Sequence, residues 1–212
     1  MKRIRDIKVK NVFQLSPNMK RITFFSEDLY DFPENEDGGY VKLLFKKESS
    51  NDSLSRPYTI RSFRKKKLEL DIDFANHSGN QGYATKWASK AKVGDEISIS
   101  GPGLKKRINV NSSWFFFVGD MTALPAIACY LERIPKSSVG IVVLEIISED
   151  DKIKLIKPKN IKIEWVVKSK ENPSVLEDSV KKIKWLQGTP YIWVACEFNL
   201  SLIHISRAHE TD

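Results

Sequence analysis

The chain has 212 residues, a length that suits one large domain or two small ones. Hydrophobic residues make up 41% and charged residues 29%, a composition that excludes collagen-like, coiled-coil and disordered proteins. Lysine and arginine number 35 against 27 acidic residues. The resulting net charge of +8 favours an anionic partner, whether a nucleic acid, a membrane surface or a phosphorylated cofactor.

The two cysteines, Cys129 and Cys196, form no CxxC pair, so neither a disulfide framework nor a cysteine-rich zinc site is indicated. The charged N-terminus lacks an apolar signal core. The most apolar stretch, Trp114 to Val118, is far too short to span a bilayer. We therefore expect a soluble protein of the cytoplasm.

From Ile4 to Ser100 the apolar residues alternate with polar ones, a period of two that predicts β-strands. Turn-rich segments separate these stretches at intervals that suit an antiparallel sheet or barrel. One segment differs, because Tyr83 to Lys92 has few β-branched residues and predicts a short helix. The alternating positions are Ile7/Val9, Ile22/Phe24, Val41/Leu43/Phe45, Leu68/Leu70/Ile72/Phe74 and Ile97/Ile99.

After Gly101-Pro102-Gly103 the pattern changes to alternating strands and helices, which predicts βα units and a parallel sheet. We therefore place a domain boundary near Asn109 to Ser113, with a barrel domain over residues 1–110 and an α/β domain over residues 111–212. The predicted strands are Trp114 to Val118, Val139 to Ile147, Ile161 to Val167 and Tyr191 to Ala195, and the predicted helices are Thr122 to Arg133 and Val175 to Lys184.

The segment Arg56-Pro57-Tyr58-Thr59-Ile60-Arg61 combines groups that suit a flavin nucleotide. A guanidinium binds a phosphate through two hydrogen bonds, an aromatic ring stacks on a heterocycle, and a hydroxyl bonds a ring nitrogen. These six residues alone favour an ordinary strand with alternating inward and outward side chains.

A glycine-bearing loop from Gly79 to Gly82 opens directly into the short predicted helix. The unpaired N–H groups and the positive end of the helix dipole then face the loop, which favours a diphosphate site. Gly82 allows close approach of the backbone to a ligand, and Thr85 adds a hydroxyl in the first turn. Helix capping is the alternative explanation for both residues.

Several motifs, in their order along the chain, resemble those of a known protein family. They are Arg-x-Tyr-Thr-x-Arg at 56–61, Asp-Phe-x-x-His at 73–77, Gly-x-Ala-Thr-x-Trp-Ala at 82–88, Gly94-Asp95 and Gly101-Pro102-Gly103. From Ile4 to Glu197 the chain resembles the siderophore-interacting protein family of ferredoxin-reductase-like flavoproteins. The resemblance implies an antiparallel FAD-binding β-barrel followed by a Rossmann-like α/β domain that binds NADPH or NADH.

The resemblance also implies site residues in the barrel domain. Arg56 matches an arginine near the FAD phosphate, Tyr58 a ring against the isoalloxazine or ribityl, and Thr59 a group near the reactive edge of the flavin. The remaining matches are Asp73 and Phe74 before the flavin loop, His77 within it, and Gly82, Ala84 and Thr85 at the pyrophosphate turn. Tyr83 stands where the family usually has proline, and His77 equally fits an ordinary loop residue.

In the second half, residues 119–127 lie at the carboxyl end of the first predicted strand, where open α/β sheets bind ligands. They resemble the family's Gly-Asp-Glu-Thr-Ala-Leu-Pro-Ala-Ile, with Met121 in place of glutamate. The nucleotide candidates are Asp120, Thr122, Ala123, Leu124 and the strand-end Glu197. By pattern alone Thr122 is a helix cap, Leu124 a core residue and Glu197 a solvated carboxylate.

The function that the resemblance implies is reduction of Fe(III) in an anionic siderophore by electrons from NAD(P)H through FAD, with release of Fe(II). The cofactor carries the chemistry, so we expect no catalytic side chain and no protein-bound metal. We also expect a monomer that binds neither nucleic acid nor membrane. One alternative is the same flavoprotein with another electron acceptor, and another is a basic β-barrel that binds nucleic acid.

Three further features are left open. The basic runs at 64–67 and 105–107 are either solvated turns or a rim for the chelate. Lys168 and Lys170 either meet a 2′-phosphate or are exposed lysines at a strand end. Residues 198–212 match no family segment, so we expect a truncated or out-of-frame end in which His204 and His209 bind no metal, with flavin binding retained and NAD(P)H turnover poor.

Overall fold

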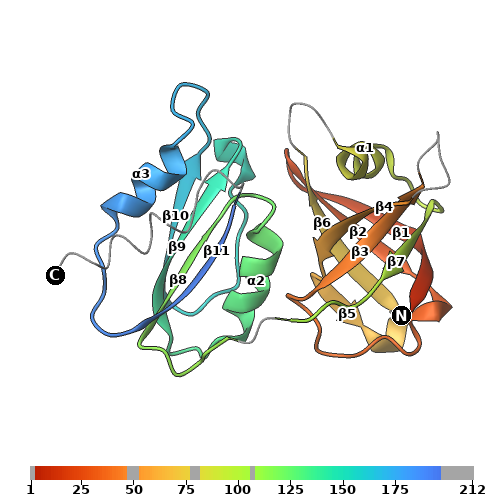
Figure 1. Cartoon of the computed structure of the whole chain (residues 1–212), viewed down its shortest axis with the longest axis horizontal. Coiled ribbons are helices and arrows are strands. Elements are labelled where there is room, and N and C mark those ends of the chain that lie inside the picture. The colour runs from red at the N-terminus through yellow and green to blue at the C-terminus, as the bar shows by residue number, and fades with distance from the viewer. Residues whose placement is uncertain (1–2, 47–52, 77–81, 106–107, 197–212) are drawn as a thin grey trace. The chain divides into compact units, whose positions relative to one another are not determined.

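A computed structural model describes residues 3–46, 53–76, 82–105 and 108–196 of the chain. It divides into two compact units, residues 1–107 and residues 108–212. Figure 1 shows strands in both units, with the helix α1 in the first and the helices α2 and α3 in the second.

The first unit is a seven-stranded antiparallel sheet that curls into a barrel (Figure 1). Its strand order is β4-β3-β7-β1-β2-β6-β5, so β4 and β5 are the two edges of the sheet. The elements are β1 Ile4–Ser16, β2 Met19–Phe25, η1 Glu27–Leu29, β3 Tyr40–Lys46, β4 Ser53–Thr59, β5 Ser62–Arg64, η2 Lys65–Lys67, β6 Glu69–Ala75, α1 Tyr83–Lys90 and β7 Glu96–Ser100.

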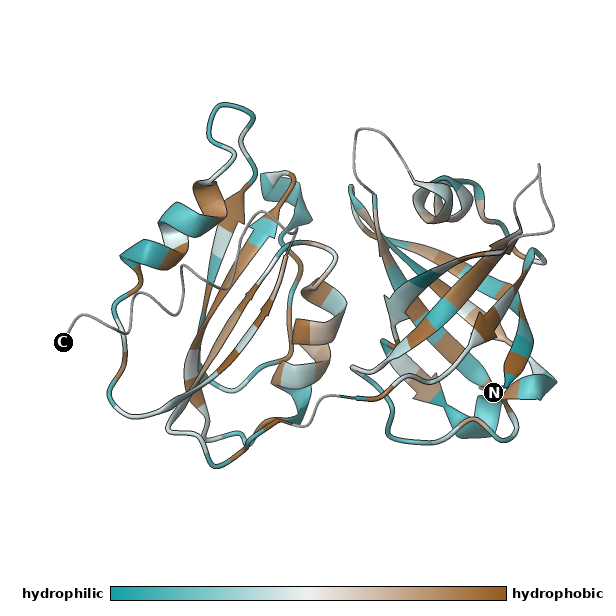
Figure 2. Cartoon of the chain, in the orientation of Figure 1, coloured by the Kyte–Doolittle hydropathy of each residue, from teal (hydrophilic) through white to brown (hydrophobic). Residues whose placement is uncertain are grey.

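Alternation along the strands builds the core of this unit, as Figure 2 shows by hydropathy. On β6, Leu70, Ile72 and Phe74 join the apolar core. The intervening Glu69, Asp71 and Asp73 are buried as well, because cations cover them. A strand with both faces covered is held from both sides, which fixes its register.

The second unit is a four-stranded parallel sheet with the order β10-β9-β8-β11. The chain passes from β8 outward to β10 and then returns to place β11 on the other side of β8. This reversal is the switch point at which such sheets bind ligands, beyond the carboxyl ends of the strands. The elements are β8 Trp114–Gly119, α2 Leu124–Arg133, β9 Val139–Ile146, η3 Glu149–Asp151, β10 Asn160–Val167, α3 Val175–Lys182 and β11 Pro190–Ala195.

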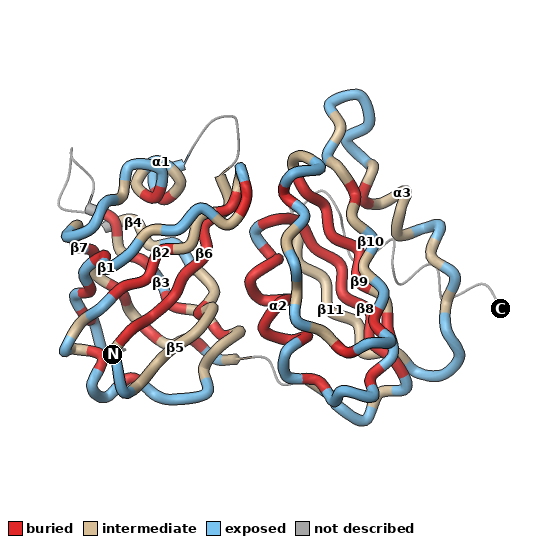
Figure 3. Tube along the Cα trace, turned by 180° about the vertical axis from the view of Figure 1, so that it is seen from behind, coloured by how far each residue is buried: buried red, intermediate tan, exposed pale blue. Residues whose placement is uncertain are grey.

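Burial in this unit decreases from the central strands to the edges. Figure 3 shows β8 and β9 buried along most of their length, whereas β11 is half-buried throughout. One apolar cluster joins β8 and β9 to α3 through Trp114, Phe116, Val143 and Leu176. The continuous apolar run of β8 therefore reflects a strand covered on both faces.

The expected fold class, an antiparallel barrel followed by a parallel α/β sheet, is confirmed. Three helix boundaries differ from the sequence expectation. The helix predicted to reach Lys92 ends at Lys90, because the backbone of Ala91 is not helical. The helix predicted from Thr122 begins at Leu124, because Thr122 and Ala123 belong to a turn closed on Asp120. The helix predicted to reach Lys184 ends at Lys182, because Ile183 is extended. No helix in the described part of the chain has the length and apolar content to cross a membrane.

Candidate cofactor sites

An aromatic pair joins two strands that are not hydrogen-bonded to each other. The rings of Tyr58 on β4 and Phe74 on β6 lie 4.6 Å apart between centroids, tilted by 40°. Tyr58 is half-buried, and burial raises the pKa of its hydroxyl to about 12 although the positive charge of Arg56 opposes the shift. The ring is therefore uncharged at neutral pH and offers an apolar surface.

The other two candidates of β4 lie beside this pair. Arg56 is exposed and donates a hydrogen bond to the carbonyl of Ser55 at 3.0 Å. Thr59 is half-buried and pairs with Tyr40 at the end of β4. The end of β4 thus carries a guanidinium, an aromatic ring and a hydroxyl within four residues, and their contact with a flavin stays a prediction.

Asp73 is engaged within the protein. Its carboxylate accepts two hydrogen bonds from Arg21 on β2, at 2.7 and 2.8 Å, and lies 3.9 Å from Nε of Arg61. The residue is 6% exposed. This charge-assisted pair joins β2 to β6. These hydrogen bonds give Asp73 a structural role in the barrel. Its contact with a cofactor stays a prediction.

The start of α1 is the predicted diphosphate site. Gly82 has an ordinary φ of −62°, and a Cβ built there meets nothing within 4 Å. Neither its backbone nor its described surroundings require a glycine, so the open space is available to a ligand. Ala84 is buried in the core, and Thr85 is half-buried in the first turn. His77 lies outside the described residues.

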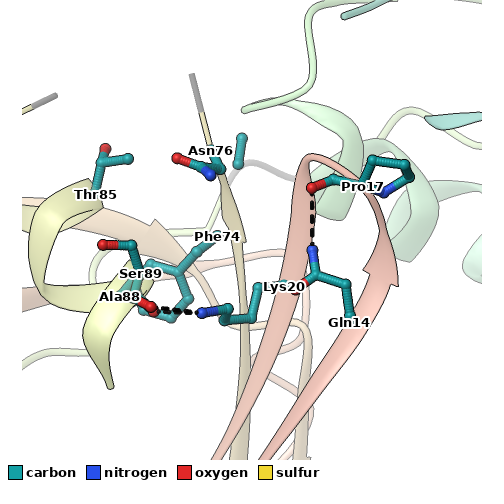
Figure 4. Close-up of a pocket in the computed structure, with 9 residues that line it drawn as sticks. Gln14, Pro17, Lys20, Phe74, Asn76, Thr85, Ala88 and Ser89 are labelled. Carbon is teal, nitrogen blue, oxygen red and sulfur yellow. Dashed lines mark hydrogen bonds between the residues drawn. The ribbon is translucent and has the colours of Figure 1, made fainter. Parts of the chain in front are cut away.

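A pocket of about 120 Å³ lies between α1 and the hairpin of β1 and β2 (Figure 4). Phe74 and Thr85, both predicted site residues, line it. The rest of the lining could not be predicted from the sequence, because these residues come together only through the barrel topology. They are Gln14, Pro17, Lys20, Ala75, Asn76, Ala88 and Ser89.

In the second unit, Asp120 closes the turn between β8 and α2. Its Oδ1 accepts hydrogen bonds from the Thr122 backbone N–H at 2.8 Å, the Thr122 hydroxyl at 2.6 Å and the Ala123 N–H at 3.3 Å. Ala123 and Leu124 are 4% and 2% exposed. Their side chains belong to the core, so only their backbone is available to a nucleotide. Glu197 lies outside the described residues.

Glu145 and Cys196, which are not among the predicted site residues, lie near the same edge together with Lys168, for which the sequence left contact with a 2′-phosphate open. Glu145 on β9 is 9% exposed, and its carboxylate lies 3.8 Å from the ammonium of Lys168, just after β10. Cys196 follows β11, and burial, together with the charges of Asp120 and Glu145, raises the pKa of its thiol to about 11. The thiol is therefore protonated at neutral pH and is a poor nucleophile.

Some residues of the two basic runs form hydrogen bonds within the barrel domain. Arg64 donates to Glu69 and Asp71 at 2.6 to 2.8 Å, and Lys65 donates to the carbonyls of Tyr30 and Phe32. Lys105 donates to the carbonyl of Asn35 at 2.6 Å. Lys66 and Lys67 are exposed, and residues 106 and 107 are outside the described part.

Comparison with known proteins defines the class. The model of the siderophore-interacting FAD-binding domain matches residues 8–55 and 46–106, and that of the siderophore-interacting protein matches residues 112–209. The chain therefore belongs to the siderophore-interacting protein family. The second match extends past Glu197, where we expected the resemblance to end.

Individual relatives agree with this assignment. Ferric vibriobactin reductase ViuB of Vibrio cholerae is 31% identical over 193 residues, covering 82% of this chain and 70% of that protein. The NADPH-dependent ferric-chelate reductase of Escherichia coli is 24% identical over 230 residues, covering 99% and 88%. The crystal structure of the siderophore-interacting protein SipS from Aeromonas hydrophila aligns with a TM-score of 0.87 at 31% identity, covering 99% and 86%.

The residues of the barrel fit a flavin dinucleotide. An aromatic surface at Tyr58 suits the flavin ring system, and an exposed cation at Arg56 and a helix start with open space at Gly82 suit the two phosphates of its diphosphate. Within the described ranges, no group of three or more His, Cys, Asp or Glu residues is arranged to hold a metal ion.

Proposed function

We propose that this protein is an NAD(P)H-dependent ferric-siderophore reductase that uses FAD. The observation that carries the proposal is the aromatic pair of Tyr58 and Phe74 beside the open start of α1, within a domain that matches the siderophore-interacting FAD-binding family. Relatives named as reductases of ferric vibriobactin and of ferric chelates support the reaction class.

In this proposal the barrel, assigned to residues 1–110, binds the flavin. Tyr58 contacts the isoalloxazine or ribityl, Arg56 a phosphate, and Thr59 the reactive edge. The N–H groups that begin α1 bind the diphosphate, because the first turn of a helix has no internal acceptors for them. Phe74, Asp73, Ala84 and His77 are assigned to the surrounding wall.

The α/β domain, assigned to residues 111–212, binds the nicotinamide nucleotide. The turn from Asp120 to Leu124 lies at the switch point of the sheet, and Thr122 is its exposed member. The three hydrogen bonds to Asp120 hold this turn in one conformation before the nucleotide arrives. Glu197 is assigned to the same site.

FAD, when bound, accepts a pair of electrons from the nucleotide and passes them on one at a time. The protein contributes position and shielding, so no side-chain acid, base or nucleophile is required. The substrate is Fe(III) in an anionic siderophore, the product is Fe(II), and the net charge of +8 favours approach of such a chelate. We propose a monomer that binds neither nucleic acid nor membrane.

Absorption spectra of the purified protein with added FAD test flavin binding, and an Fe(II)-trapping dye then reports reduction of ferric chelates by NADPH or NADH. We expect a bound-flavin spectrum and nucleotide-driven iron reduction. A protein that neither binds FAD nor reduces iron contradicts the proposal. A panel of acceptors under one condition separates a siderophore reductase from a flavoprotein that prefers a quinone, free flavin or a redox protein.

A further inference from the structure

One lysine ties the helix α1 to the barrel wall. Lys20 lies on β2, and its ammonium donates hydrogen bonds to the carbonyls of Ala88 and Ser89, both at 3.0 Å (Figure 4). These carbonyls belong to the last turn of α1, where backbone acceptors have no partner within the helix. A cation here also complements the negative end of the helix dipole.

The two flanks of α1 are held differently. On one flank Trp87 packs against the rings of Phe24, Phe45 and Phe74, with centroid distances of 6.1 to 6.2 Å. On the flank of Lys20, the pocket of about 120 Å³ separates the helix from the β1–β2 hairpin. Packing there is incomplete, so the position of the helix on this side depends on the two hydrogen bonds.

The same lysine is a neighbour of the aromatic pair. Lys20 on β2 is paired in register with Phe74 on β6, and Phe74 contacts Tyr58 across the edge of the sheet. The strand position that holds the end of α1 is therefore adjacent to Phe74, which is assigned to the wall of the flavin site. An eight-residue helix is marginal by itself in water, so its place is set by such tertiary contacts.

We propose that Lys20 is a positioning residue for the cofactor: it fixes the tilt of α1 and thereby places the N–H groups at the start of the helix for the diphosphate of FAD. The inference rests on the proposed function. Hydrogen bonds to phosphate oxygens require separations of roughly 2.7 to 3.2 Å between donor and acceptor, so a small change of tilt removes them. Lys20 itself bonds only to the far end of the helix in this role and does not touch the flavin.

The test compares FAD with riboflavin, which has the same ring system and no phosphate. In Lys20→Gln we expect the Kd for FAD to rise by about tenfold and the Kd for riboflavin to stay within about twofold, because only FAD uses the start of α1. Lys20→Arg retains a cationic donor and restores most of the FAD affinity. Lys90→Gln is the matched control, since it removes a charge from the same end of the same helix.

The outcomes separate this inference from the proposed function. Unchanged FAD affinity in Lys20→Gln overturns the positioning role while leaving the function intact, and so does an equal loss of FAD and riboflavin. A wild-type protein that binds no FAD overturns both. If Lys20→Gln does not fold, Lys20→Met, which keeps the apolar stem, is measured with the same two flavins. A ratio of FAD affinity to riboflavin affinity equal to that of the wild type then overturns the positioning role.

Discussion

Tyr58 and Phe74 come from β4 and β6, which are not neighbours in the sheet, and yet their rings lie 4.6 Å apart. The contact spans the region where the sheet is not closed by hydrogen bonds. Rings in such a contact are held by packing rather than by a strand ladder, so they form a preformed surface on which a third flat ring can stack.

The first prediction follows from that surface. Tyr58→Ala removes the half-buried ring of the pair and should weaken FAD binding by about tenfold, as expected for one lost aromatic contact. Tyr58→Phe should bind FAD like the wild type, because the hydroxyl is uncharged at neutral pH. Quenching of flavin fluorescence during titration measures both. An unchanged affinity for FAD in Tyr58→Ala would show that the ring does not contact the flavin.

The second prediction concerns the open space at Gly82. Alanine is compatible with its φ and meets no described atom, so Gly82→Ala should change the stability of the flavin-free protein by less than about 1 kcal/mol. The added methyl should nevertheless weaken FAD binding by about tenfold, because it occupies the ligand's approach. Calorimetry and flavin titration check the two parts.

Gly94 provides the control for this substitution. Its φ of +96° is unfavourable for alanine, so Gly94→Ala should destabilise the protein by about 1 kcal/mol or more without changing FAD affinity. The opposite pattern, with Gly82→Ala destabilising and binding FAD normally, would show that Gly82 serves the fold and not the cofactor.

The third prediction is a loss of barrel stability in acid. Burial alone would raise the pKa of Asp71, but hydrogen bonds from Arg64 and Thr23 outweigh it and leave the pKa below its ordinary value. Lys10 and then Arg64 lower the pKa of Glu69 in the same way. The folded protein therefore binds fewer protons than the unfolded chain in mild acid, and this stability is lost as the pH falls below about 4.

Arg64→Met should destabilise the barrel at pH 7 by about 2 kcal/mol, because Asp71 is left buried without its main partner. The variant should also lose less stability than the wild type between about pH 5 and 3, since its carboxylates have pKa values nearer the unfolded ones. Denaturant unfolding at several pH values measures this. Parallel curves for the two proteins would exclude the network as the cause.

The fourth prediction concerns the choice between NADPH and NADH. Lys168 lies 3.8 Å from the buried Glu145 at the edge assigned to the nucleotide. Lys168→Ala removes a cation from this edge, so the KM for NADPH, which carries an additional phosphate, should rise more than the KM for NADH. Lys170→Ala, an exposed lysine two residues on, is the comparison. Equal changes in both KM values would place Lys168 outside the site.

The sequence by itself determined the two halves of the fold, since a period of two and then alternating strand and helix patterns result from burial on one face or on both. The sequence also placed the candidate residues of β4 together, because Arg56, Tyr58 and Thr59 are close along one strand and need no folding to be brought together. Local patterns of this kind depend on residues that are close in the chain.

Only the tertiary structure decided which distant residues share a site. The ion pair of Asp73 with Arg21 joins residues far apart in sequence, and so do the contacts of Tyr58 with Phe74 and of Lys20 with the end of α1. A carboxylate in a motif looks equally suited to a ligand or to an arginine until the strand register is known. Register depends on the packing of the whole sheet, which no single segment encodes.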